Sequence, residues 1–224
     1  MRIAVLGTGT VGSTIGSKLV SLGHDVVMGS RTADNPKAAA WIATCLTDAA
    51  ATGGTAGAAA YADAAAGAEL IVNATAGTGS LDALRAAGAV NLAGKVLLDI
   101  SNPLDFSRGM PPSLSVSNTD SLGEQIQREF PDASVVKSLN TMTAAVMTNP
   151  STVAGAHSVF VSGEDANAKG EVRNLLISFG WPPDRIIDLG GIVSARGVEM
   201  YLPLWLNLMA ALGTPMFNIA VARA

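Results

Sequence analysis

A glycine triplet directly after a short apolar run is the feature that most limits the folds open to this chain. Gly7, Gly9 and Gly12 follow the apolar residues 3–6, and a helical pattern continues over 11–22. In such a unit the first glycine permits a tight turn, the second lets backbone approach a phosphate, and the third lets helix and strand pack closely. The helix N-terminus can then hold phosphates. The spacing predicts a dinucleotide-binding turn made of Gly7, Thr8, Gly9, Thr10, Val11 and Gly12.

Apolar runs of strand length recur along the chain, at 26–28, 70–72, 96–100, 135–136, 159–161 and 186–187. Helical patterns such as 166–179 separate them, and a weak third strand is expected near 57–60. Continuous apolar strands that alternate with helices are typical of a parallel sheet covered on both faces. We expect an α/β fold: a Rossmann-type, doubly wound parallel sheet with a smaller, mainly helical C-terminal part. Residues 1–140 would form the dinucleotide-binding domain, and 141–224 would complete the crevice.

Composition limits the class of protein and of partner. The chain has 224 residues, 49% hydrophobic and 14% charged, so a packed globule is expected. A net charge of −4 argues against nucleic acid as the main partner. The apolar stretch 201–212 is too short to span a bilayer, so no membrane partner is expected. The single cysteine, Cys45, excludes an internal disulfide; we interpret it as a buried thiol and expect a cytoplasmic protein.

The end of the second strand indicates which dinucleotide is bound. It reads Ser30-Arg31-Thr32, where NAD enzymes usually place an acid that accepts from the ribose 2′-hydroxyl. A carboxylate would repel a 2′-phosphate, whereas Arg31 can pair with it and Ser30 and Thr32 can donate to it. Lys37 adds positive charge. The alternative is that Arg31 is an exposed loop cation, with Asp34 close by in sequence. We therefore predict NADP as the cofactor.

Small polar residues follow three of the expected strands. Because ligands bind beyond the carboxyl ends of the strands in doubly wound sheets, we expect the nicotinamide half of the dinucleotide there. The same residue types also cap helices and begin turns, which is the alternative for each of them. Lys137, the one cation nearby, either contacts a ligand or ends its strand facing solvent. The candidate residues are Asn73, Ala74, Thr75, Ala76, Asn102, Pro103, Leu139 and Asn140.

Groups suited to acid–base chemistry are scarce in the sequence. His24 and His157 lie next to expected strands, and we interpret both as structural. Neither Tyr61 nor Tyr201 is followed four positions later by lysine, as in short-chain dehydrogenases, and no spacing suggests a metal site. Hydride transfer between two cofactors needs mainly proximity and orientation, whereas reduction of a carbonyl normally also needs a proton donor. The pattern therefore favours a protein that holds two flat ligands.

Four stretches, the opening 3–31, then 71–77, 99–105 (DISNPLD) and 135–141 (VVKSLNT), resemble the NADP oxidoreductase, coenzyme F-420-dependent family. That family includes NADPH:deazaflavin oxidoreductases and, more distantly, the reductase domains of membrane ferric reductases. The resemblance implies NADP on the glycine turn, with 2′-phosphate contacts from Ser30 and Arg31. It also implies a second ring stacked near Asn73–Ala76, Asn102-Pro103 and Leu139-Asn140. The deazaflavin enzymes tend to read Gly-Gly-Thr-Gly where this chain has Gly-Thr-Gly-Thr-Val-Gly.

Three functions stay open at this point. The leading one is an NADP-dependent oxidoreductase that transfers hydride between NADPH and a flat acceptor, a deazaflavin of the F-420 type or a flavin. The second is a reductase of a small imine or ketone that takes its proton from solvent. The third is a non-catalytic NADP sensor that binds a protein partner.

Three segments outside the expected sheet have their own signals. Residues 103–118 have little periodicity, which is typical of a lid or binding loop, or else of a disordered one. Ser121 and Glu124 have capping-box spacing, so a helix should start there. The segment 200–212 is apolar around most of its circumference, which implies burial against the sheet, a partner subunit or a ligand. It suggests a homodimer.

Overall fold

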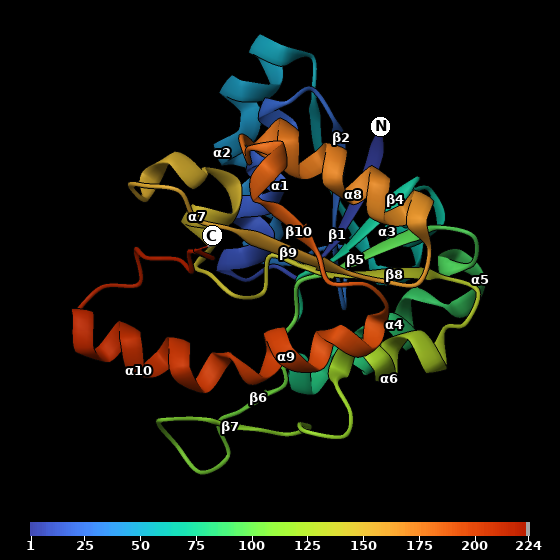
Figure 1. Cartoon of the computed structure of the whole chain (residues 1–224). Helices are drawn as coiled ribbons and strands as arrows, with labels where there is room; N and C mark the ends of the chain where they lie inside the picture. The colour runs from blue at the N-terminus through green and yellow to red at the C-terminus, as the bar shows by residue number, and fades with distance from the viewer. Residues whose placement is uncertain (223–224) are drawn as a thin grey trace.

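An eight-stranded sheet runs through the middle of the protein in the computed structural model, which describes residues 1–222 (Figure 1). The strand order is β10-β9-β8-β5-β4-β1-β2-β3. The strands are β1 (Arg2–Leu6), β2 (Asp25–Ser30), β3 (Thr55–Ala60), β4 (Leu70–Asn73), β5 (Val96–Asp99), β8 (Ser134–Ser138), β9 (Val159–Ser162) and β10 (Ile186–Asp188).

Helices cover both faces of the sheet (Figure 1). Along β1, Ile3 and Val5 enter the core beneath α1, α2 and α8, while Ala4 and Leu6 enter the core beneath α3, α4 and α6. Both faces of each central strand are therefore buried, which explains the continuous apolar runs. The helices are α1 (Thr10–Ser21), α2 (Pro36–Thr52), α3 (Tyr61–Ala66), α4 (Ser80–Ala87), α5 (Ala89–Leu92), α6 (Leu122–Glu129), α7 (Ala144–Thr148), α8 (Ala166–Phe179), α9 (Ala195–Met200) and α10 (Leu202–Leu212).

The predicted α/β sheet is confirmed, with one departure from the parallel arrangement. β8 and β9 pair antiparallel, Lys137 opposite Ser162, while all other neighbours in the sheet are parallel. For two neighbouring strands to be parallel, the chain must return to the end of the sheet at which the first strand began before it starts the second. Between β8 and β9 the chain forms only α7 and a short turn, η2 (Pro150–Thr152). It does not return, and β9 starts at the same end of the sheet at which β8 stops.

Three local predictions have clear outcomes. The weak strand expected near 57–60 is β3, which begins two residues earlier, at Thr55. The helix start predicted from the capping-box spacing is confirmed, because Ser121 caps α6 and its Oγ accepts from the Glu124 backbone N–H at 3.1 Å. The segment 103–118 is a small antiparallel ribbon of β6 (Leu104–Asp105) and β7 (Ser113–Leu114), with Phe106 and Met110 exposed at its tip.

The C-terminal part is largely helical, as expected, but it shares the sheet. β9 and β10 extend the sheet beyond residue 140, so a domain boundary at that position stays a prediction. Within α10 only Leu202 is buried. The sheet domain therefore does not cover this helix, which leaves a partner subunit or a ligand from the three alternatives given for its apolar surface. Among residues 1–222 no helix combines the length and apolar character that crossing a bilayer requires.

Candidate functional site

The glycine turn between β1 and α1 has the geometry that its spacing predicts. Gly7 has a φ of +117°, and a Cβ there would lie 2.6 Å from the carbonyl oxygen of Ala74. At Gly12 a Cβ would lie 2.0 Å from the carbonyl oxygen of Gly7, so helix and turn pack too closely for any side chain. Around Gly9, by contrast, no atom lies within 4 Å of the Cβ position. Two glycines thus shape the turn, and the third leaves its backbone open to a ligand.

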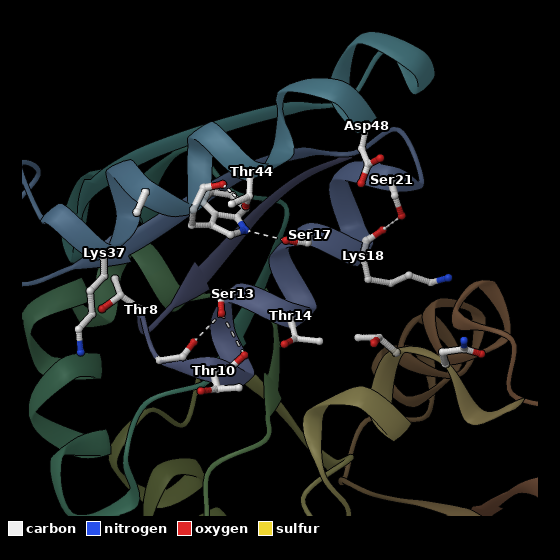
Figure 2. A pocket seen from close by; sticks show the side chains of 15 residues that line it. Thr8, Thr10, Ser13, Thr14, Ser17, Lys18, Ser21, Lys37, Thr44 and Asp48 are labelled. Atoms are coloured by element: carbon white, nitrogen blue, oxygen red, sulfur yellow. Dashed lines mark hydrogen bonds between the residues drawn. The ribbon is translucent and has the colours of Figure 1, made fainter. Parts of the chain in front are cut away.

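Two cavities adjoin this turn. One, of about 670 Å³, lies between Thr8-Gly9, Arg31, Tyr61 and the segment 74–86; we call it the Arg31 cavity. The other, of about 1010 Å³, follows the outer face of α1 between α2 and α7, and we call it the α1 groove. Figure 2 shows hydroxyl groups along the groove floor, with Lys37 at one end and Lys18 toward the other. Thr8 and Gly9 line both cavities, so the turn is the point at which they meet.

The turn after β2 places its residues in different environments. Arg31 is exposed, lines the Arg31 cavity, and makes no ion pair with the carboxylates of residues 1–222. Burial raises the pKa of neighbouring Tyr61, and the Arg31 charge opposes that shift. Thr32 is exposed, and Lys37 lies in the first turn of α2 on the α1 groove. Ser30 is 3% exposed and its Oγ donates to the Thr32 carbonyl, so the hydroxyl shapes the turn, and its contact with a 2′-phosphate stays a prediction.

Asn73 and the residues after it form the turn between β4 and α4. Asn73 is fully buried, and its Nδ2 donates to Asp99 Oδ1 at 2.8 Å and to Ser80 Oγ at 2.6 Å. Its Oδ1 accepts from Thr75 Oγ1 at 2.7 Å. The amide therefore supports the turn from below. Ala74, Thr75 and Ala76 line the Arg31 cavity, as members of the predicted cofactor site should.

The segments 101–103 and 139–141, here called the edge loops, are joined by their asparagines. Asn102 Nδ2 donates to the Asn140 carbonyl at 2.8 Å, and Asn140 Nδ2 donates to Asn102 Oδ1 at 2.9 Å. Pro103 is buried beside them. Leu139 has a φ of +63° and a side chain that is 1% exposed in the core. The side chain of Leu139 therefore lies in the core, and the place of this residue in the cofactor site stays a prediction.

Lys137 neither faces solvent nor ends in a cavity, which settles the alternatives left open for it. Its Nζ lies 2.8 Å from Asp99 Oδ2 and 2.8 Å from Glu199 Oε1, and it also donates to the Ser101 carbonyl. Burial alone would lower the pKa of Lys137, but the two carboxylates outweigh burial and raise it. Sequence reasoning missed Asp99 and Glu199. A signal was available in the sequence: Asp99 interrupts the apolar run 96–100, and Lys137 directly follows the apolar run 135–136. Because buried Asp and Lys are almost always paired, these two could have been expected to pair.

The two histidines and the cysteine lie outside the Arg31 cavity and the α1 groove. His157 Nε2 contacts the Pro150 carbonyl at 2.9 Å, and its Nδ1 lies 2.9 Å from Asn218 Nδ2. Burial and the nearby N-terminal amine lower the pKa of His24 in its turn. Cys45 is buried and free. In the part of the chain that the structure describes, no cluster of His, Cys, Asp and Glu could hold a metal ion.

Comparison with known proteins agrees with this geometry. The family model "NADP oxidoreductase coenzyme F420-dependent" matches residues 2–103. The crystal structure of a proposed F420-dependent NADP-reductase from Arthrobacter sp. FB24 is 56% identical, covers 100% of both chains and superposes with a TM-score of 0.90.

Two other proteins, both longer, are similar to most of this chain. Metalloreductase STEAP3 of Rattus norvegicus is 30% identical over 211 residues, which are 91% of this chain and 38% of that protein. The chain thus spans well under half of that relative. A reductive aminase from Aspergillus terreus, solved with NADPH and ethyl levulinate, is 16% identical with a TM-score of 0.62, over 95% of this chain and 62% of the other. At that identity the likeness shows the fold alone.

Proposed function

We propose, on the premise that this chain belongs to the F420-dependent NADP oxidoreductase family, that it transfers hydride between NADPH and a deazaflavin of the F-420 type. The chain is an NADP-dependent oxidoreductase, so a non-catalytic sensor is set aside. What the family leaves open is the acceptor. The observation that favours a flat coenzyme concerns the charged groups near the carboxyl ends of the strands. Asp99 and Glu199 both pair with Lys137, and all three side chains are 0–2% exposed, so none of them is placed to give a proton to a small substrate.

The residues around the glycine turn fit NADP. The open backbone at Gly9 and the N-terminus of α1 would hold the pyrophosphate. The exposed Arg31, with Lys37 and Thr8 across the turn, would hold the 2′-phosphate. Ala74 and Ala76 leave room beside the turn for the rest of the dinucleotide.

Catalysis in this proposal depends on orientation. The bound nicotinamide supplies the hydride to the acceptor. The edge loops would hold the two rings face to face through their backbone and through Asn102 and Asn140. The proton that completes the reduction would come from water, so the chain needs no buried acid there.

Rapid mixing of the protein with NADPH and an oxidised deazaflavin tests the proposal. We expect the visible band of the deazaflavin to bleach, at a rate changed at most a fewfold by a chelator or by replacing either His24 or His157 with alanine. No bleaching, with a simple imine or ketone turned over instead, would contradict it. Failure of every acceptor despite tight NADPH binding would contradict both candidates.

One observation favours an imine or ketone reductase as the second candidate. A cavity of about 270 Å³ next to Thr141 has largely apolar walls and is lined by Tyr201. The Tyr201 hydroxyl is protonated near neutral pH, and burial raises its pKa above the ordinary value of 10.0. A small substrate in this cavity could take its proton from that hydroxyl. Under this candidate Tyr201→Phe lowers turnover at least about tenfold; for deazaflavin reduction it has little effect.

We also propose that two copies of the chain associate through α10. No charged residue occurs from Met200 to Ala222, and Leu204 and Leu212 are 54% and 57% exposed. Figure 1 shows α10 along the margin of the molecule, reaching beyond the sheet. An uncharged, apolar surface can contact its own copy without placing like charges together. A cytoplasmic location stays a prediction.

A further inference from the structure

The buried ammonium of Lys137 contacts three separate segments of the carboxyl edge. It donates to Asp99 Oδ2 at the end of β5, to the Ser101 carbonyl in the first edge loop, and to Glu199 Oε1 on α9. The three charged side chains are 0%, 0% and 2% exposed. Lys137 itself is the second-last residue of β8, and only Ser138 separates it from the second edge loop.

Each partner of Lys137 passes the connection on. Asp99 Oδ1 accepts from the Ser101 backbone N–H at 3.1 Å and from the Ser101 hydroxyl at 2.6 Å. Ser101 is thus held on both its N–H and its carbonyl, and Asn102 follows it. On the other side, Glu199 accepts from the first backbone N–H groups of α6, Leu122 at 2.8 Å and Gly123 at 3.0 Å.

The second edge loop is held by the residue that precedes Glu199. Asn140 Nδ2 donates to the Val198 carbonyl at 3.2 Å as well as to Asn102. The position of Asn140 therefore depends on where α9 lies, and α9 is attached to Lys137 through Glu199. The cation therefore connects both edge loops, in addition to the direct hydrogen bonds between Asn102 and Asn140.

Such a cluster is an expensive way to obtain stability. Removing three charges from water costs several kcal/mol for each, and well-packed apolar side chains of similar volume often serve a fold equally well. What a cation between two carboxylates adds is direction, because each hydrogen bond fixes one segment at one distance.

We propose that Lys137 is a positioning residue for the nicotinamide end of the site. Through Asp99, Ser101 and Glu199 it holds the edge loops so that the bound ring cannot rotate and presents one face to its acceptor. This inference rests on the proposed function, which places the ring at the edge loops. It assigns no contact between Lys137 and the cofactor.

The test separates the two ends of the cofactor. Lys137→Met removes the cation, and Lys95→Met is the matched control, since Lys95 Nζ donates to the carbonyls of Ala65 and Ala66 at the opposite end of β5. Calorimetry with 2′,5′-ADP measures the adenosine end alone, and we expect affinities within about twofold of the unmutated protein for both variants. Time-resolved fluorescence anisotropy of bound NADPH measures motion of the reduced ring. We expect a fast-rotating component in Lys137→Met only.

A second variant guards against loss of the fold. Asp99→Asn/Lys137→Met removes both charges of one pair, so the buried cluster keeps the net negative charge of the unmutated protein, now carried by Glu199 alone. A mobile ring with normal 2′,5′-ADP affinity in either variant supports the inference. A ring as rigid as in the unmutated protein, or loss of 2′,5′-ADP binding in both variants, overturns it.

The anisotropy measurement needs no acceptor, so the two proposals can fail separately. If deazaflavin is not reduced but the ring becomes mobile in Lys137→Met, the proposed acceptor is wrong and the positioning role holds. If Lys137→Met reduces deazaflavin normally and its bound ring stays rigid, the proposed acceptor is correct and the positioning role is wrong.

Discussion

At the scale of single residues, we propose that Arg31 gives the site its preference for NADPH over NADH. It is exposed on the Arg31 cavity, and no carboxylate of residues 1–222 pairs with it, so its charge is available to a 2′-phosphate. A charge-assisted hydrogen bond contributes roughly 1.5–3 kcal/mol, so Arg31→Ala should weaken NADPH binding about ten- to a hundredfold and NADH binding hardly at all. Calorimetry with both cofactors measures this. Arg108→Ala, an exposed arginine on the β6–β7 ribbon, should change neither affinity. Equal affinity of the unmutated protein for NADPH and NADH would rule out the assignment.

Gly9 and Gly12 should respond differently to the same methyl group. A Cβ at Gly12 meets the Gly7 carbonyl, so Gly12→Ala should cost roughly 1–3 kcal/mol of stability, or about 2–4 °C in Tm for each kcal/mol. A Cβ at Gly9 meets nothing, so Gly9→Ala should stay folded and lose cofactor affinity instead. Thermal unfolding without cofactor, followed by NADPH titration, separates the two effects. A Gly9→Ala protein as unstable as Gly12→Ala would contradict this division.

Residue positions differed in how far sequence could predict them. The glycine turn depends on close contacts within one strand–turn–helix unit, and its spacing was sufficient. Ser30 was assigned to the ligand because its hydroxyl can donate, and Leu139 because it follows a strand; the sequence did not show that Leu139 has a side chain in the core or that the Ser30 hydroxyl donates to Thr32. The Lys137 cluster was missed because Asp99 lies 38 residues away and only the folded sheet brings the two together.

At the scale of elements, the start of α6 depends on charge as well as on its cap. Asp120 accepts from Arg128 at 2.8 and 2.9 Å and from Gln125 at 3.1 Å, and these contacts, the Arg128 bonds first, lower its pKa to about 2. A lowered pKa contributes stability that is present above the unfolded value of 3.8 and is lost as the pH falls through about 2.

The urea midpoint of the unmutated protein should therefore fall more steeply between about pH 4 and pH 2 than that of Asp120→Asn. Replacing Asp132, an exposed aspartate that makes no ion pair within residues 1–222, should leave the steepness unchanged. Identical pH profiles for the unmutated protein and Asp120→Asn would show that the Asp120–Arg128 pair adds nothing to folding.

Elements of the sheet were predictable where the chain must cross from edge to edge. The inner strands β1, β2, β4, β5 and β8 are separated by helices and lie between two apolar cores, so apolar runs located them. β3, at the edge of the sheet, is only partly buried and gave only a weak signal. The direction of β9 was not predictable. The segment between β8 and β9 contains a helix of only five residues, and hydrophobic periodicity does not show whether such a segment returns to the other end of the sheet.

At the scale of the whole molecule, α10 sets the expected assembly. Apolar side chains that one copy leaves exposed are covered when two copies meet, and burial of apolar surface contributes roughly 25 cal/mol for each Å². We expect light scattering after size exclusion to give a dimer at micromolar concentration, and Leu204→Glu/Leu212→Glu to give a monomer, because burying two carboxylates in an apolar contact is unfavourable.

The matched control for that variant is Val90→Glu, since Val90 is 84% exposed on α5, away from α10 in the sequence and in the fold. It adds the same charge and should remain a dimer. Leu204 and Leu212 line neither the Arg31 cavity nor the α1 groove, so the monomeric variant should keep its NADPH affinity within about twofold if binding needs only one copy. A monomeric unmutated protein would contradict the dimer. A variant that is monomeric and has also lost NADPH would instead indicate that each site takes part of its structure from the second copy.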